Sequence, residues 1–178
     1  MTDPTRTDDA VLARIGRLVM LHRGGDRTEA RTRLLRLWAE IGVPGDPLHR
    51  CTLAHFLADT QDDPADALAW DLRALSAAVE LSEAGTAGRP RGPVVARALY
   101  PVLHLSLAVD YAALGRADAA RSHLRHARRT AEAAWRDGRD GHHTDVHAAV
   151  RRLERRLART APDLDDGGQP GAPDATQA

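Results

Sequence analysis

A chain of 178 residues is long enough for one domain with a buried core, and its 25 acidic and 25 basic residues leave no net charge. The single cysteine excludes an internal disulfide, and no uninterrupted apolar run is long enough to predict a transmembrane helix. Every basic residue is arginine, which together with abundant alanine, glycine, aspartate and proline is typical of a GC-rich bacterial genome, such as an actinobacterial one. The polar N-terminus does not resemble a signal peptide, so we expect a cytoplasmic protein.

Composition also favours an all-α fold. Alanine and leucine are strong helix formers and dominate the chain, whereas runs of β-branched residues are nearly absent. Aromatic residues are scarce, with three Trp, two Tyr and one Phe, so the core would consist of small side chains. Helices with such side chains can approach one another closely.

Apolar residues recur at helical spacing in seven segments, which are separated by breaks rich in glycine, proline and aspartate. The pattern predicts helices over residues 8–22, 28–41, 47–59, 64–83, 93–114, 117–135 and 142–160. Asp63 is a good N-cap, and Pro64 suits the first position of the helix that follows. Residues 1–7 and 161–178 lack an apolar pattern, so we expect disordered tails on either side of one domain at 8–160.

Three of the breaks share one pattern, in which an apolar helix stops at a short polar turn and an alanine follows five residues later. Gly25 is followed by Ala30, Asp62 by Ala67 and Gly115 by Ala120. A small residue is needed where two antiparallel helices cross closely beside a turn. The sequence therefore predicts three helical hairpins and a closing seventh helix.

The third hairpin carries a further pattern around its turn, LGRADAA. Leu107–Ala108 occupies the position of a Leu-Gly pair in a known repeat motif. Tyr111 occupies the position of the tyrosine in that motif, and Ala127 occupies the position of its late small residue. In these positions the hairpin resembles the tetratricopeptide repeat (TPR) family. Weaker matches are Ala54–His55, Ala58, Ala67, Ala74 and Leu75 in the second hairpin, and Gly25, Asp26 and Ala30 in the first. The turns are about 37 and then 53 residues apart, against the 34 of the family.

The TPR-like resemblance implies a short right-handed superhelix of helix pairs that acts as an interaction or adaptor module rather than as an enzyme. A peptide or protein segment would bind in the concave groove, and the protein would need no cofactor. The groove residues would be His49, Thr52, Phe56, Asp59, Leu105, Val109 and Ala112. Alternatively, Leu105 and Val109 pack under the seventh helix or at a contact between two copies of the chain.

Three soft metal ligands support a different function. Cys51 and His55 are spaced i, i+4 on one helix, and His104 occupies the place equivalent to Cys51 on the next groove-lining helix. If they converge, they would suit a zinc, copper or haem site, or a small-molecule site with catalytic groups. A related alternative places the chemistry at His55, Asp71 and Trp70. The absence of a second cysteine from the sequence argues against a metal site.

Charge is distributed unevenly along the chain. Residues 46–83 carry eight acids against two arginines, whereas residues 115–160 carry twelve arginines against six acids. The seventh helix presents two basic rows, formed by Arg151, Arg152, Arg155, Arg156 and Arg159. No helix-turn-helix or aromatic platform accompanies them, so we prefer a solvated face, or one that meets an acidic partner or a second copy, over nucleic-acid binding.

The remaining motifs point to no specific chemistry. His142, His143 and His147 would bind metals only incidentally, and His123 and His126 are expected on an exposed arginine-rich face. The chain has no Walker loop, GxSxG, HExxH, paired CxxC or dinucleotide-binding motif. The commoner enzyme classes are therefore not indicated.

Overall fold

The computed structural model describes residues 4–83, 92–136 and 143–159, and all the secondary structure of these residues is helical. The helices are α1 Pro4–Arg23, α2 Arg27–Ile41, α3 Pro47–Asp59, α4 Pro64–Glu83, α5 Gly92–Ala113, α6 Ala117–Arg136 and α7 His143–Arg159. The all-α prediction is confirmed. Only α1 departs clearly from its predicted bounds. It begins at Pro4 and therefore includes residues 4–7, which we predicted to belong to a disordered tail. The segment 161–178 lies outside the described residues.

Local capping explains why the central helices begin where they do. The Asp46 carboxylate accepts a hydrogen bond from the backbone N–H of Leu48 at 2.8 Å, and Pro47 occupies the first helical position of α3. Asp63 accepts in the same way from Ala65 at 2.8 Å, directly before α4. Each carboxylate satisfies an N–H group that has no partner within the helix, so both starts are fixed by sequence next to them.

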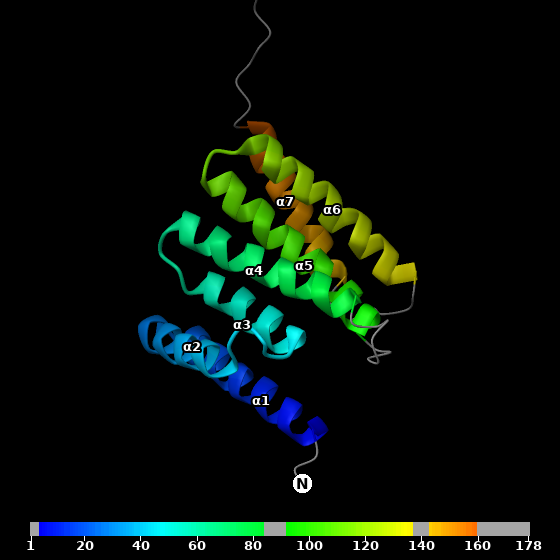
Figure 1. The fold of residues 1–178 in the computed structure, drawn as a ribbon. Helices are drawn as coiled ribbons and strands as arrows, with labels where there is room; N and C mark the ends of the chain where they lie inside the picture. Colours follow the sequence, from blue (N-terminus) through cyan, green and yellow to red (C-terminus); the bar gives the residue numbers. More distant parts are fainter. Residues whose placement is uncertain (1–3, 84–91, 137–142, 160–178) are drawn as a thin grey trace, which may run out of the picture.

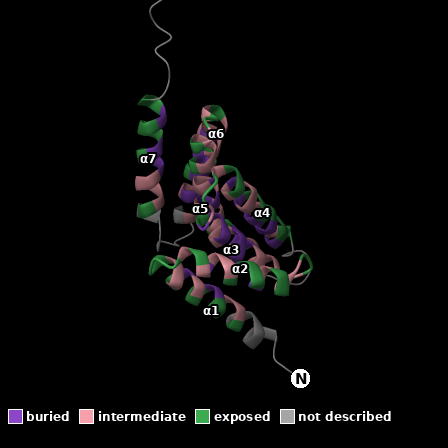
Figure 2. Ribbon diagram, turned by 90° about the vertical axis from the view of Figure 1, so that its left-hand side faces the viewer, coloured by how far each residue is buried: buried purple, intermediate pink, exposed green. Residues whose placement is uncertain are grey.

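Helix pairs and core clusters follow the chain order (Figure 1). α1 packs on α2, α3 on α4 and α5 on α6, while α4 lies between α3 and α5, and α7 packs on α5 and α6. The core consists of three clusters that occupy the inward faces of the helices (Figure 2). They are Ile15, Val19, Leu34, Leu37, Leu53 and Leu57 in α1–α3; Cys51, Ala54, Ala74, Ala77, Ala78 and Leu103 in α3–α5; and Ala108, Ala120, Leu124, Ala127, Val150, Leu153 and Leu157 in α5–α7.

Two of the three alanines predicted at helix crossings have that role. Ala30 and Ala120 are fully buried, as close contact between antiparallel helices requires. Ala67 is only half-buried and lies at the surface of a cleft. The second hairpin is therefore open at the place where the other two are closed.

Gly115 ends α5 in a left-handed conformation, with φ at 72°. Replacing it with alanine is expected to lower the free energy of unfolding by about 1 kcal/mol, because a Cβ is unfavourable in this conformation. Replacing Gly16, at an exposed position inside α1, with alanine should instead raise the free energy of unfolding by about 0.5–1 kcal/mol, because alanine has the higher helix propensity. A Cβ at either position meets no atom within 4 Å. Urea unfolding measures both effects, and two changes of the same sign would contradict this account.

By length and composition alone, α5 is also apolar enough to cross a membrane. A third of its most apolar window is buried against other helices of the protein. The central helix of a helical bundle has the same composition, so this property does not distinguish the two environments.

Candidate functional site

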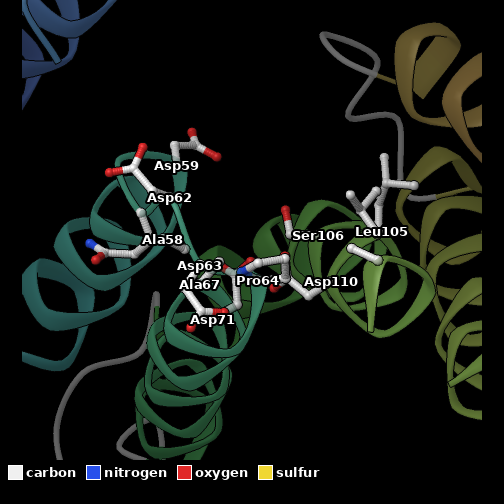
Figure 3. A pocket seen from close by; sticks show the side chains of 13 residues that line it. Ala58, Asp59, Asp62, Asp63, Pro64, Ala67, Asp71, Leu105, Ser106 and Asp110 are labelled. Carbon is white, nitrogen blue, oxygen red and sulfur yellow. The ribbon is translucent and has the colours of Figure 1, made fainter. Parts of the chain in front are cut away.

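A cleft of about 400 Å³ opens between the end of α3, the start of α4 and the second half of α5 (Figure 3). We call it the acidic cleft, because five aspartates line it and its described lining contains no arginine and no histidine. Its lining residues are Ala58, Asp59, Gln61, Asp62, Asp63, Pro64, Ala67, Asp71, Leu105, Ser106, Val109, Asp110 and Ala113. The two largest apolar members, Leu105 and Val109, belong to α5, whereas four of the five aspartates belong to the end of α3, the first half of α4 and the turn between them.

Two of the five aspartates already have structural partners at the rim. Asp62 forms ion pairs with Arg27 at 3.0 Å and Arg31 at 3.2 Å, both on α2. Asp63 caps α4, as described above. The three remaining acids of the lining are Asp59, Asp71 and Asp110.

A row of hydrogen-bonded side chains runs from α3 across α4 to α5. The Nδ1 atom of His55 lies 3.1 Å from Oδ1 of Asp71, whose residue is only 2% exposed. Asp71 in turn shares a hydrogen bond with Asp110, and Figure 3 shows these two side chains approaching from α4 and α5. The Oδ2 atom of Asp110 is buried and has no hydrogen-bond partner among the described residues. Two carboxyl groups thus share one low-polarity site.

This arrangement changes the proton affinity of the site. Burial, followed by the negative charge of Asp71 and the hydrogen bond to it, raises the pKa of Asp110 to about 7. Burial also raises the pKa of Asp59. Burial lowers the pKa of His55, but the hydrogen bond and charge of Asp71 outweigh it, so that the pKa of His55 is raised overall. At neutral pH the acidic cleft therefore holds protons that a bound cation can displace.

The predicted groove residues separate into two groups. Asp59, Leu105 and Val109 line the acidic cleft, and Leu105 also packs against the α5–α7 cluster, as its alternative interpretation expected. The others do not reach this cleft. His49 is buried at 4% exposed, Thr52 bonds to the backbone of its own helix, Phe56 borders a separate hollow beside α1, and Ala112 packs against the α5–α7 cluster.

The predicted metal ligands do not converge. Cys51 is buried in the α3–α5 cluster, where burial and then the charge of Asp71 raise its pKa to about 12. His55 pairs with Asp71, and His104 places its Nδ1 atom 3.0 Å from that of His123. Across residues 4–83, 92–136 and 143–159, no three His, Cys, Asp or Glu side chains are placed to hold a metal ion. Each of the three side chains therefore has a different set of neighbours in the structure.

The predicted contact between His55 and Asp71 is present, but Trp70 takes no part in it. Its indole ring packs edge-on against Trp38, with the ring centroids 5.1 Å apart, and the Arg73 guanidinium lies 4.7 Å from the Trp70 centroid. Trp70 therefore belongs to the interface between core clusters and not to the acidic cleft.

Two structural features were not predicted from the sequence. Asp110 received no role, although it is one of only two charged residues in the apolar helix α5, and that isolation was the available signal. His123 was expected on an exposed face but is half-buried, stacks on Tyr111 at 5.3 Å and contacts His104. No local signal distinguishes His123 from the exposed His126.

Comparisons with known proteins give no family for the chain. No protein-family model, curated protein or solved structure matches it. The contacts and charges of the acidic cleft are therefore the basis for inferring a function.

Proposed function

We propose that the protein is a helical interaction module that binds a positively charged segment of a peptide or protein partner in the acidic cleft. The supporting observation is a cavity of about 400 Å³ with five aspartates and no described basic side chain in its lining. In this proposal the three helix pairs form a short TPR-like superhelix, and α3 and α5 present the binding surface. A homo-oligomer is compatible with it, because the arginine-rich α6 and α7 of a second copy also carry positive charge.

The chemistry of the cleft favours an arginine or lysine side chain as the bound group. Leu105 and Val109 supply an apolar wall for its aliphatic stem, while Asp59 and Asp110 can accept hydrogen bonds from its charged end. A cation beside Asp110 stabilises the ionised carboxylate and reduces the repulsion from Asp71. Binding therefore releases a proton near neutral pH and becomes tighter as the pH rises through 7.

Replacing Asp59 and Asp110 together with asparagine is expected to weaken binding of a fluorescein-labelled peptide of alternating arginine and leucine by at least ~tenfold, because charged hydrogen bonds are lost. Fluorescence polarisation at pH 8 measures the affinity. The control is Asp66→Asn, which removes one exposed acid at the start of α4 that does not line the cleft and is compared with each single variant, Asp59→Asn and Asp110→Asn. Equal weakening in the control would show diffuse attraction to the acidic hairpin and would contradict the proposal.

A second candidate function is acid–base chemistry on a small molecule. It is favoured by one observation, the link from His55 through Asp71 to Asp110, whose pKa lies near 7, as general acid–base groups require. Native mass spectrometry of untagged protein separates the two functions. A small molecule that is retained by the wild type and lost on Asp110→Asn would favour the second, and an empty or protein-bound chain would favour the first.

A further inference from the structure

A second cleft of about 400 Å³ lies between α1 and α2 and has the opposite charge. We call it the arginine cleft, and its lining residues are Arg14, Arg17, Leu18, Leu21, Arg33, Arg36 and Glu40. It shares no residue with the acidic cleft. Four guanidinium groups and one carboxylate thus surround two leucines.

Helical spacing brings these side chains together. The α1 members recur at intervals of three and four residues from Arg14 to Leu21, and the α2 members do so from Arg33 to Glu40. Residues at such spacing share one helix face, and the cleft is lined by one such face of α1 and one of α2, beside the buried contact between the two helices. Leu18 and Leu21 are half-buried and form the apolar part of the lining.

The positive charge of the arginine cleft is only partly compensated. Arg14 donates to both carboxylate oxygens of Glu40, at 2.8 and 3.2 Å, and Arg33 pairs with Glu29 at 2.6 Å. In the described parts of the chain no acid pairs with Arg17 or Arg36. Four arginines against Glu40 and Glu29 leave two positive charges, on Arg17 and Arg36, one on each side of the cleft.

We propose that the arginine cleft is a binding site for a phosphate group carried by a small molecule. The planar guanidinium fork matches phosphate oxygens in a bidentate geometry, and two opposed uncompensated forks match the charge of a phosphate dianion. The volume lies within the range of small-molecule sites, and the leucines can contact an apolar part of the ligand. The site is independent of the proposed function of the acidic cleft.

Glu40 acts in this site as an internal competitor for the phosphate. Its hydrogen bond with Arg14 lowers the pKa of the Glu40 carboxyl, so that it is ionised at neutral pH. A phosphate that engages Arg14 must share it with Glu40 or displace it. Removing the Glu40 charge should therefore tighten phosphate binding.

The test uses isothermal titration of the full chain with sodium pyrophosphate at pH 7.5 and low salt. Arg17→Gln with Arg36→Gln is expected to weaken binding by about tenfold, as the loss of charged hydrogen bonds predicts, and Glu40→Gln to tighten it about threefold. The control is Arg152→Gln with Arg155→Gln, which removes two exposed arginines from α7, outside the arginine cleft. All these side chains are exposed or at the surface, so circular dichroism should show an unchanged helical fold.

Equal weakening in the α7 control would overturn the proposal, because it would show diffuse attraction to arginine. The absence of saturable pyrophosphate binding, together with no binding to phosphatidic acid vesicles, would overturn it as well. Binding to pyrophosphate that depends on Arg17 and Arg36 supports a free phosphorylated metabolite as the source of the group. Binding to the vesicles alone, with the same dependence, supports the same phosphate chemistry in a lipid headgroup.

Discussion

Replacing Asp110 with asparagine is expected to raise the free energy of unfolding at pH 8 by about 1–2 kcal/mol and to leave it nearly unchanged at pH 4. Folding raises the pKa of Asp110 from 3.8 to about 7, so the folded chain holds a proton that the unfolded chain releases. Stability from this group is present below pH 4 and is lost as the pH rises to about 7. A shift of this size in a fully buried group would contribute about 4 kcal/mol, and partial solvent exposure reduces it to the stated range.

Urea unfolding of the wild type and of Asp110→Asn at several pH values measures this difference. Asparagine can still donate a hydrogen bond to Asp71, which makes it a close substitute for the protonated acid. Asp66→Asn, at the exposed start of α4, is the control for removing a negative charge from this hairpin. A variant less stable than the wild type at pH 8 would show that Asp110 is held charged by a favourable partner. The stabilisation also ensures that weaker peptide binding in the double variant is not caused by unfolding.

Acidification is expected to destabilise the contact between α5 and α6 through His104. Burial, followed by the charges of His123, His126 and Arg129, lowers the pKa of His104 from 6.5 to about 4. The unfolded chain then binds the proton more tightly, so stability from this group is present above pH 6.5 and is lost as the pH falls towards 4. The half-exposed ring limits the loss to about 1–2 kcal/mol.

His104→Gln tests this expectation, because glutamine retains a hydrogen-bonding group beside His123 but does not titrate. The free energy of unfolding is compared at pH 7.5 and pH 4.5 for the wild type and the variant. The variant should lose less stability on acidification, even if it is less stable at pH 7.5. If the variant loses as much stability on acidification as the wild type, groups other than His104 cause the acid sensitivity. Asp110 acts in the opposite direction over the same pH range. Asp110→Asn and His104→Gln should therefore change the slope of unfolding free energy against pH in opposite directions.

Helix positions could be predicted from the sequence because their signals are local. The Asp46–Pro47 and Asp63–Pro64 pairs each place a cap directly before the first turn, and Gly115 adopts the left-handed conformation that ends α5. These signals need no knowledge of the tertiary structure. For this reason α3 and α4 have the predicted bounds.

The residues that form the candidate site were harder to predict from the sequence, because they depend on how each helix is rotated about its axis. His55 and Asp71 are on helices joined by a short turn, so their contact could be suggested from the sequence. Asp110 reaches the same site from α5, across a long connection, and His104 turns towards α6 instead of towards Cys51. Spacing along a helix identifies residues on one face but does not identify the helix that this face meets.

The three core clusters share helices instead of a common centre, since α3 contributes to the first two and α5 to the last two. Each end of the molecule therefore depends mainly on its nearest neighbour, as in proteins built from stacked units. Duplication, loss or exchange of the first hairpin, α1 and α2, would disturb the α1–α3 cluster directly and leave the other two in place. The acidic cleft, which α3, α4 and α5 line, would be retained in that case, while the arginine cleft between α1 and α2 would be gained or lost as a unit.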